Sequence, residues 1–194
     1  MRYLALLAVL AGCDSSDRSG DNDGSVVLLG QPCSVDDVTG TLPGVSVSIS
    51  SSSCLYRVGE PAQFTYRVTT TAAVPAIDIP DSSSCACDHR TAEISSWLAW
   101  SIGGTSASGN SQQYCLCDTG CCAPQASTTI TPVVGTFANT LEWSGRVWGG
   151  PSDTGNPEGA FFQVGTYGVT VRFSGYAMGF VEATLPIEIL GFPR

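Results

Sequence analysis

The sequence contains no lysine and only one histidine, His89, and its eight arginines are outnumbered by seventeen acidic residues. The net charge of −9 argues against nucleic acid and anionic lipid as partners, because both bind through basic patches. A serine nucleophile normally needs a base beside it, and a lone histidine offers little choice of one. Gly-x-Ser-x-Gly and phosphate-binding motifs are also missing. We therefore expect no catalytic residue, no cofactor and no enzymatic activity.

Charged residues make up only 13% of the chain, whereas serine, threonine, glycine and valine are abundant. Average globular domains carry about 25% of charged residues. The low charge and the abundance of small and β-branched residues are typical of an all-β secreted domain. The length is enough for one domain with a hydrophobic core of its own.

The chain begins MRYLALLAVLAGC, in which one arginine precedes an apolar run that ends in small residues and a cysteine. The run is too short to span a bilayer, which takes about twenty residues, and it suits a secretion signal. Its end, Leu10-Ala11-Gly12-Cys13, resembles the lipobox of bacterial lipoproteins. The resemblance implies that residues 1–12 are removed as a signal peptide and that Cys13 is lipidated. It places the protein in the bacterial cell envelope, anchored in the inner or outer membrane and facing the periplasm or the surface.

The segment after Cys13, DSSDRSGDNDGS, contains no apolar residue and cannot offset the entropy lost on ordering. We therefore interpret residues 13–25 as the lipidated cysteine and a flexible acidic tether. Residues 26–194 are then expected to form one folded domain. Removal of residues 1–12 would take away Arg2 and change the net charge from −9 to −10.

Apolar and polar residues alternate in the folded part with the two-residue period of β-strands. The clearest runs are VSVSIS from Val45, AQFTYRVTT from Ala62, SWLAWSI from Ser96, YGVTVRF from Tyr167 and VEATLPIEI from Val181. Turn residues separate these runs and no long stretch shows a helical period, which predicts an all-β fold, a single antiparallel β-sandwich. The pattern of SWLAWSI predicts a strand buried on both faces. Pro186 predicts an edge position or a bulge in the last strand.

Two segments resemble bacterial immunoglobulin-like domains. Val58-Gly59-Glu60-Pro61 is similar to the entry of their second strand, and Gly165-Thr166-Tyr167 to the entry of their penultimate strand. The resemblance implies an immunoglobulin-like sandwich with Tyr167 at the tyrosine corner, where its hydroxyl bonds back to the main chain. Val169 stands where antibody domains have a cysteine, so the usual disulfide between the sheets is absent.

A shorter pattern over about residues 133–173 is similar to the bacterial intracellular proteinase inhibitor family, another small β-sandwich. It consists of a glycine before an aromatic strand that ends in Trp143, a loop, and then Gly165-Thr166-Tyr167. The pattern supports the fold and implies proteinase inhibition as an alternative function.

Eight cysteines remain beside Cys13, an even number in a protein expected outside the cytoplasm, where disulfides form and persist. We expect four disulfides, a stapled sandwich, from Cys33, Cys54, Cys85, Cys87, Cys115, Cys117, Cys121 and Cys122. The adjacent Cys121 and Cys122 are not expected to bond to each other, because disulfide geometry needs a larger separation.

The connectivity that we favour divides the cysteines by their position in the chain. Cys33 pairs with Cys54 near the N-terminus, which leaves 15 arrangements of the other six. Cys85 and Cys87 then bond to two of the four later cysteines. These bonds would staple together two loops that contain few apolar residues.

Metal binding is the alternative for the cysteine-rich segments. CACDH, from Cys85 to His89, and CLCDTGCC, from Cys115 to Cys122, together offer six thiols and the only histidine. Thiolates would select copper(I) or zinc. The Cys-x-x-Cys spacing common in zinc sites does not occur, however, and His89 stands alone. We therefore assign no metal ligands.

The connection RVWGGPSDTGNPE, which ends at Glu158, is the candidate binding loop. It places Trp148 near Asp153, Asn156 and Glu158, whose oxygen atoms suit calcium in a secreted protein. The alternative is a turn-rich connection in which aspartate and asparagine cap their own backbone. We favour the turn-rich connection.

These features predict an envelope lipoprotein with a binding or structural role, since immunoglobulin-like domains usually recognise partners through their loops. The expected contacts are the membrane, through the lipid anchor, and an envelope protein or glycan. A proteinase inhibitor and a copper- or zinc-binding protein are the alternatives.

Overall fold

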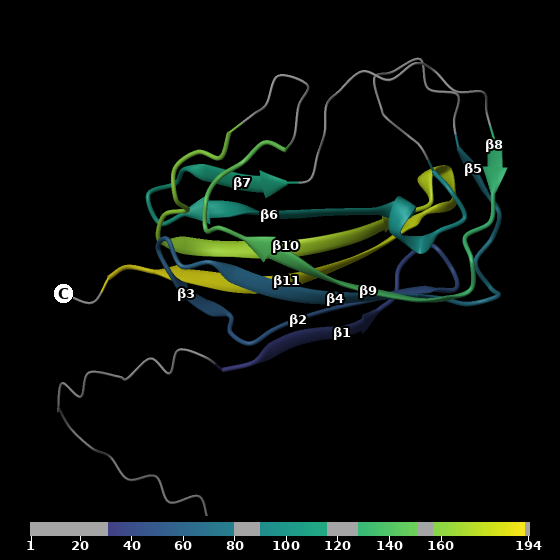
Figure 1. Ribbon diagram of the computed structural model, residues 1–194, viewed down its shortest axis with the longest axis horizontal. Helices are drawn as coiled ribbons and strands as arrows, with labels where there is room; N and C mark the ends of the chain where they lie inside the picture. The colour runs from purple at the N-terminus through teal and green to yellow at the C-terminus, as the bar shows by residue number, and fades with distance from the viewer. Residues whose placement is uncertain (1–30, 80–89, 116–127, 151–156, 193–194) are drawn as a thin grey trace, which may run out of the picture.

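The computed structural model describes residues 31–79, 90–115, 128–150 and 157–192, which form an all-β domain (Figure 1). Its strands are β1 (Cys33–Val38), β2 (Val45–Ser51), β3 (Leu55–Arg57), β4 (Ala62–Thr70), β5 (Ile77–Ile79), β6 (Leu98–Ser106), β7 (Ser111–Cys115), β8 (Thr128–Ile130), β9 (Gly135–Trp143), β10 (Gly165–Ser174) and β11 (Phe180–Leu190). Two short 3-10 helices accompany them, η1 (Ile94–Trp97) and η2 (Tyr176–Met178). No helix among these residues is long and apolar enough to cross a membrane.

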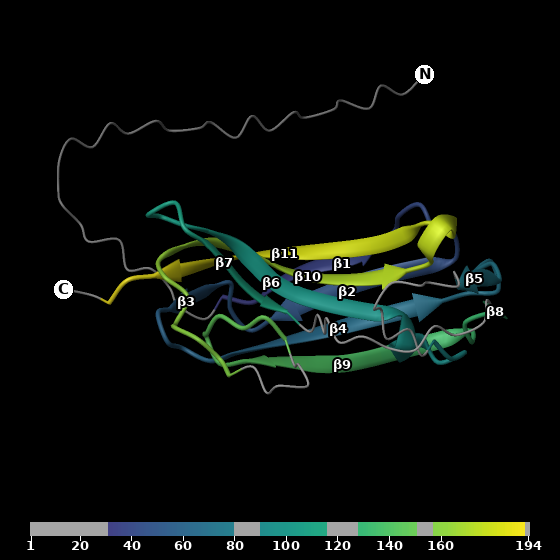
Figure 2. The same ribbon diagram turned by 90° about the horizontal axis from the view of Figure 1, so that it is seen from above.

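The strands form two facing sheets and one small sheet at an end of the molecule (Figures 1 and 2). The first sheet has the order β1-β2-β4-β9 and the second β3-β11-β10-β6-β7, while β5 pairs with β8. Every pair is antiparallel except β3 with β11. β4 and β9 thus lie opposite β6, β10 and β11, as strands B and E lie opposite C, F and G in immunoglobulin domains. The predicted immunoglobulin-like β-sandwich is confirmed.

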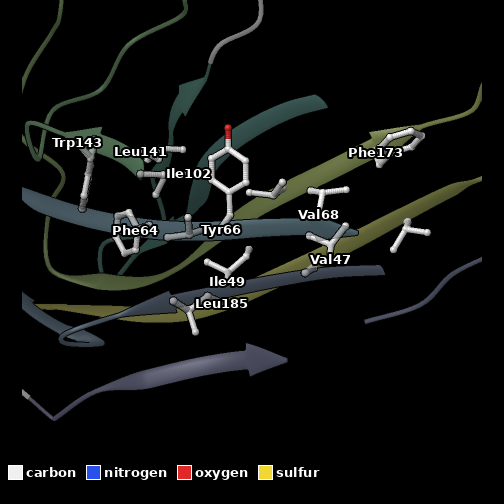
Figure 3. Close-up of a cluster of buried hydrophobic side chains, with 14 of the residues drawn as sticks. Val47, Ile49, Phe64, Tyr66, Val68, Ile102, Leu141, Trp143, Phe173 and Leu185 are labelled. Carbon is white, nitrogen blue, oxygen red and sulfur yellow. The ribbon is translucent and has the colours of Figure 1, made fainter. Parts of the chain in front are cut away.

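The hydrophobic core lies between the two larger sheets and follows the predicted alternation. In β4, Phe64, Tyr66 and Val68 are buried, and in β11 every second residue is buried. Side chains of both sheets, among them Val47 and Leu185, meet in this interior (Figure 3). Burial of one such side chain contributes about 1.5–3 kcal/mol, so the facing sheets supply most of the stabilisation.

Tyr167 occupies the corner position predicted for it. Its ring is buried, and its hydroxyl donates to the main-chain oxygen of Gln163 at 3.0 Å or to Oε1 of Gln112 at 2.7 Å. Two residues on, Val169 is fully buried and pairs with Ile102 of β6. The predicted bond of Tyr167 to the main chain is confirmed, and apolar packing fills the place of the usual cysteine.

The predicted disulfide between Cys33 and Cys54 is confirmed, with the two Cα atoms 6.0 Å apart. Cys33 begins β1 in the first sheet. Cys54 lies directly before β3, and its main-chain oxygen accepts from the N–H of Glu188 in the second sheet. The bond therefore links the two sheets at one end of the sandwich, whereas the disulfide of antibody domains links them at the centre.

The segment SWLAWSI is not a strand buried on both faces, and that prediction is wrong. Trp97 belongs to η1, where its indole N–H donates to the main-chain oxygen of Thr91 at 2.9 Å. Its ring stacks on Phe173 with centroids 6.0 Å apart. The burial of Trp97 thus comes from the helical turn at the start of β6, and Ala99 in the strand itself is exposed.

Pro186 lies in β11 opposite Gly168 of β10, and the register continues past it without a bulge. On its other side β11 pairs with β3 only over residues 188–190. Within the described residues no strand pairs with this side at Pro186. β11 is therefore not the edge strand of its sheet, which is β3, but Pro186 lies where this side of β11 is locally unpaired among the described residues.

Candidate functional site

The structure describes five of the candidate cysteine and binding-loop residues: Cys33, Cys54, Cys115, Trp148 and Glu158. The remaining ones lie outside the described residues, namely Cys13, Cys85, Cys87, His89, Cys117, Cys121, Cys122, Asp153 and Asn156. The predictions for their lipidation, bonding or ligand roles stay predictions.

The end of β7 and the start of the candidate binding loop, far apart in the sequence, lie side by side. Tyr114 and Trp148 form a parallel bridge. The N–H of Trp148 donates to the oxygen of Gln113 at 2.9 Å, and the N–H of Cys115 donates to the oxygen of Trp148 at 3.2 Å. The structure thus joins the first residue of the cysteine-rich segment to the loop that contains Trp148.

Three aromatic side chains form a row at this junction. The rings of Trp100 and Tyr114 stack with centroids 5.4 Å apart, and those of Tyr114 and Trp148 lie 5.2 Å apart. Trp100 and Trp148 are half-buried, which leaves part of each indole in contact with solvent. Sequence analysis missed Tyr114 because β7 was not identified as a strand. The only available signal was the short SQQYC run that precedes the cysteine-rich segment.

Glu158 contributes charge to the same region. Its carboxylate accepts from the hydroxyl of Ser144 at 2.8 Å. Burial, and secondly the negative charge of Glu158, raise the pKa of Tyr114 above its ordinary value. The Tyr114 hydroxyl therefore stays protonated and remains a hydrogen-bond donor beyond the usual pH range of tyrosine.

A hollow of about 450 Å³ opens where the loop meets β7. Its lining includes Gln113, Cys115, Val147, Trp148, Pro157 and Gly159. Trp148 supplies an aromatic wall, and Gln113 supplies a polar side chain. A concave surface of mostly apolar groups with a few polar ones is the usual form of a binding site for a small group of a larger ligand.

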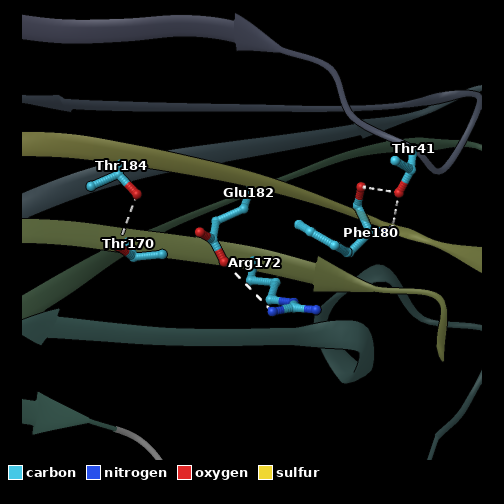
Figure 4. Close-up of polar contacts among 6 residues, drawn as sticks. All are labelled: Thr41, Thr170, Arg172, Phe180, Glu182 and Thr184. Atoms are coloured by element: carbon cyan, nitrogen blue, oxygen red, sulfur yellow. Dashed lines mark hydrogen bonds and ion pairs between the residues drawn. The ribbon is translucent and has the colours of Figure 1, made fainter.

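A second hollow of about 280 Å³ lies beside the first on the outer face of the second sheet and shares two lining residues with it. It is lined by Ala99, Trp100, Ser101, Gln113, Cys115, Thr170, Arg172 and Glu182. Figure 4 shows the polar contacts of this face: Arg172 and Glu182 form an ion pair at 3.7 Å, and the hydroxyls of Thr170 and Thr184 lie 3.0 Å apart. Trp148 lines the first hollow and Trp100 the second, whereas Tyr114, whose ring lies between theirs, is buried and lines neither.

Cys115 is disulfide-bonded and buried, and its partner lies outside the described residues. This bond removes Cys115 from the six thiols of the metal hypothesis. Among the described residues, no group of three or more histidine, cysteine, aspartate or glutamate side chains could hold a metal ion. The metal hypothesis therefore depends on side chains outside the described part of the chain.

No protein-family model matches the chain, and no curated protein matches its sequence. A function is therefore inferred from the chemistry of its own residues.

Proposed function

We propose that this protein is a lipoprotein of the bacterial cell envelope whose immunoglobulin-like domain binds an envelope protein or glycan. The observation that carries the proposal is the Cys33–Cys54 disulfide, to which the bond at Cys115 adds a second. Disulfides form and persist outside the cytoplasm, which agrees with export directed by residues 1–12. The role of the domain is binding or structural, without catalysis.

The proposed anchor at Cys13 precedes the start of β1 at Cys33 by twenty residues. Several acyl chains on one cysteine hold a protein stably on a bilayer. We propose that residues 14–25 act as a flexible polar tether, since a coil of about twelve residues would have an end-to-end distance near 20 Å. The tether keeps the domain close to the membrane and lets it turn toward a partner.

The surface around Trp148 is the proposed binding site. Tryptophan and tyrosine supply a large contact area at a low cost in conformational entropy, and tryptophan is enriched among the residues that dominate binding energy. Trp100 and Trp148 are both half-buried and each lines one of the two hollows, so part of each side chain is left for a ligand. The exposed parts of these two indole side chains suit either a sugar ring or an apolar side chain of a protein.

The anchor is tested by metabolic labelling of the full chain with a fatty-acid analogue. Wild type should be labelled and should fractionate with membranes, whereas Cys13→Ser should lose the label and keep residues 1–12. Cys33→Ser is the matched control, because it removes another cysteine near the N-terminus and should stay labelled. Label on Cys13→Ser would overturn the lipobox assignment.

The binding site is tested by placing a photoreactive amino acid at Trp148 and, as control, at Thr65 on the outer face of β4, in the anchored protein in its own envelope. We expect covalent adducts from position 148 and few from position 65. Sensitivity of the adduct to proteinases or to glycan hydrolases identifies its class, and a trapped proteinase would favour the inhibitor alternative. Equal or absent adducts at the two positions would contradict the proposed site.

A further inference from the structure

The edges of the two larger sheets differ in how they are protected against pairing with another strand. The outer edge of β7 is occupied by the main chain at Trp148, as described above. β1 has a register shift between Val35 and Val38, and the exposed Asp36 and Asp37 lie at this bulge, Asp37 with a φ of 44°. A bulge twists an edge strand, and exposed carboxylates place charge along it. Both features discourage the addition of another strand.

The other edge of the second sheet, formed by β3 and β11, is protected in other ways. β3 contains only three residues, and short edge strands offer few main-chain groups. The stretch of β11 that β3 leaves uncovered contains Pro186, which has no N–H, and Glu182, which is exposed. Each of these edges thus has a feature that discourages strand addition.

β9 has none of these features. It pairs with β4 over nine residues, from Gly135 to Trp143, without a register shift. Its sequence, GTFANTLEW, contains no proline and no lysine, and its only charge is Glu142 near one end. Figure 2 shows β9 as the outermost strand along one side of the domain. The middle of the strand, at Ala138, Asn139 and Thr140, is exposed.

The main-chain groups that β9 leaves unpaired can be assigned. Gly135 donates its N–H to the Thr70 hydroxyl of β4 at 3.1 Å, so its main-chain groups face β4. Main-chain groups alternate along a strand, so those of Thr136, Ala138, Thr140 and Glu142 face outward. Among the described residues, the only hydrogen bond to this outer row comes from Asn139, whose Oδ1 accepts from the N–H of Thr140 at 2.8 Å.

We propose that two copies of this chain associate through β9, antiparallel, about a two-fold axis at Asn139. The pairing would join two four-stranded sheets into one continuous sheet across the dimer. In this register Ala138 of each copy lies opposite Thr140 of the other, and Glu142 lies opposite Thr136, so no like charges face each other. Because β9 is the unprotected edge, the two-fold contact uses the same edge on both copies and closes the assembly as a dimer.

The mass of the full chain tests the proposal, measured by sedimentation and light scattering with detergent micelles in excess. Wild type should show a concentration-dependent dimer. Ala138→Pro removes an N–H that faces outward and leaves the bonds to β4 in place, so it should be a folded monomer. Thr184→Pro is the matched control. The N–H of Thr184 also faces outward, away from β10, but it lies in β11, so this variant should remain dimeric.

A second pair of variants avoids proline. Ala138→Lys with Thr140→Lys sets like charges opposite each other across the axis and should also give a monomer. Gln63→Lys with Thr65→Lys places the same charges on the same sheet face in β4, and should leave the dimer intact. A wild type that is monomeric at every concentration overturns the proposal. It does so even if addition of envelope extract protects the β9 amides from hydrogen exchange, because the molecule bound at β9 would then not be a second copy of this chain. A dimer that survives both β9 variants overturns it as well.

Discussion

The end of the sandwich that contains Cys33–Cys54 and the region around Cys115 are held together in different ways. At the first, the disulfide closes a sequence separation of 21 residues, and the Tyr56 hydroxyl donates to the main-chain oxygen of Ser53 at 2.6 Å. All of these groups come from one stretch of chain. At the second, Cys115 is placed by main-chain bonds to Trp148, from a distant segment.

This difference separates what local sequence can specify from what only the tertiary fold brings together. The Cys33–Cys54 end is built from neighbours in the chain, so its bond could be predicted from the position of two cysteines. The Cys115 region depends on the approach of β7 to the connection after β9, which no local pattern encodes. The first region is therefore expected to contribute to global stability, and the second to the surface that meets a ligand.

The largest expected effect is the loss of the disulfide end. Replacing both cysteines, Cys33→Ser with Cys54→Ser, should lower the free energy of unfolding by about 2–4 kcal/mol, largely because the unfolded chain gains entropy. Urea denaturation followed by far-UV circular dichroism measures it. The double replacement leaves no free thiol to mispair with the other cysteines.

The control for this variant is the Cys115 region itself. The temperature is first adjusted so that the double variant and wild type have the same global stability. The Cys115 and Trp148 amides should then be as well protected from hydrogen exchange, relative to the other amides, in the double variant as in wild type. A selective loss of protection at these amides would show that the two regions are coupled, and the comparison would then fail.

A smaller effect is expected from two tyrosine hydroxyls, that of Tyr56 at the disulfide end and that of Tyr167, which also bonds to Gln112 of β7. Tyr56→Phe and Tyr167→Phe should each lower the free energy of unfolding by about 1 kcal/mol, the scale of a lost hydrogen bond, since each hydroxyl bonds to the main chain. Midpoints in urea measure both. Val68→Ala is a reference for apolar packing alone, and should cost more than either. A midpoint unchanged in Tyr167→Phe would mean that the corner hydrogen bond does not stabilise this domain.

The sequence predicted one of these tyrosines and missed the other for a physical reason. The Gly165-Thr166-Tyr167 entry recurs in immunoglobulin-like domains, so the bond of Tyr167 could be expected from its resemblance alone. Tyr56 lies in a three-residue strand whose short length gives no periodic signal. Its partners, Ser51 and Ser53, come from a serine run that looks like an ordinary loop.

The same distinction holds for strands and for the site. The runs at β4, β10 and β11 alternate over nine or more residues and were predicted, because one face of each strand meets the core. β7 and the row of Trp100, Tyr114 and Trp148 were not, since the row draws on three separate segments. Trp97 was assigned to a strand because a buried 3-10 turn and a buried strand are equally apolar over a few residues.

The smallest effects expected are pKa changes, and they test whether the two regions are electrostatically separate. Burial raises the pKa of Tyr56, the bond from Ser51 opposes this, and the charge of Glu60 adds to it. Burial and then the charge of Glu158 raise the pKa of Tyr114. Glu60→Gln should therefore lower only the pKa of Tyr56, and Glu158→Gln only that of Tyr114.

Titration of ring-labelled tyrosine by NMR measures both pKa values in each variant. Because the folded-state pKa lies above the unfolded value of about 10, the stability that these tyrosines contribute is complete below pH 10. It is lost as the pH rises from about 10 through the raised folded-state values, and each glutamine variant should lose less of it in total, because the loss ends at its lower folded-state pKa. If Glu158→Gln moves the pKa of Tyr56 as far as that of Tyr114, charge acts across the whole sandwich. The Cys115 region would then no longer be electrostatically independent of the disulfide end.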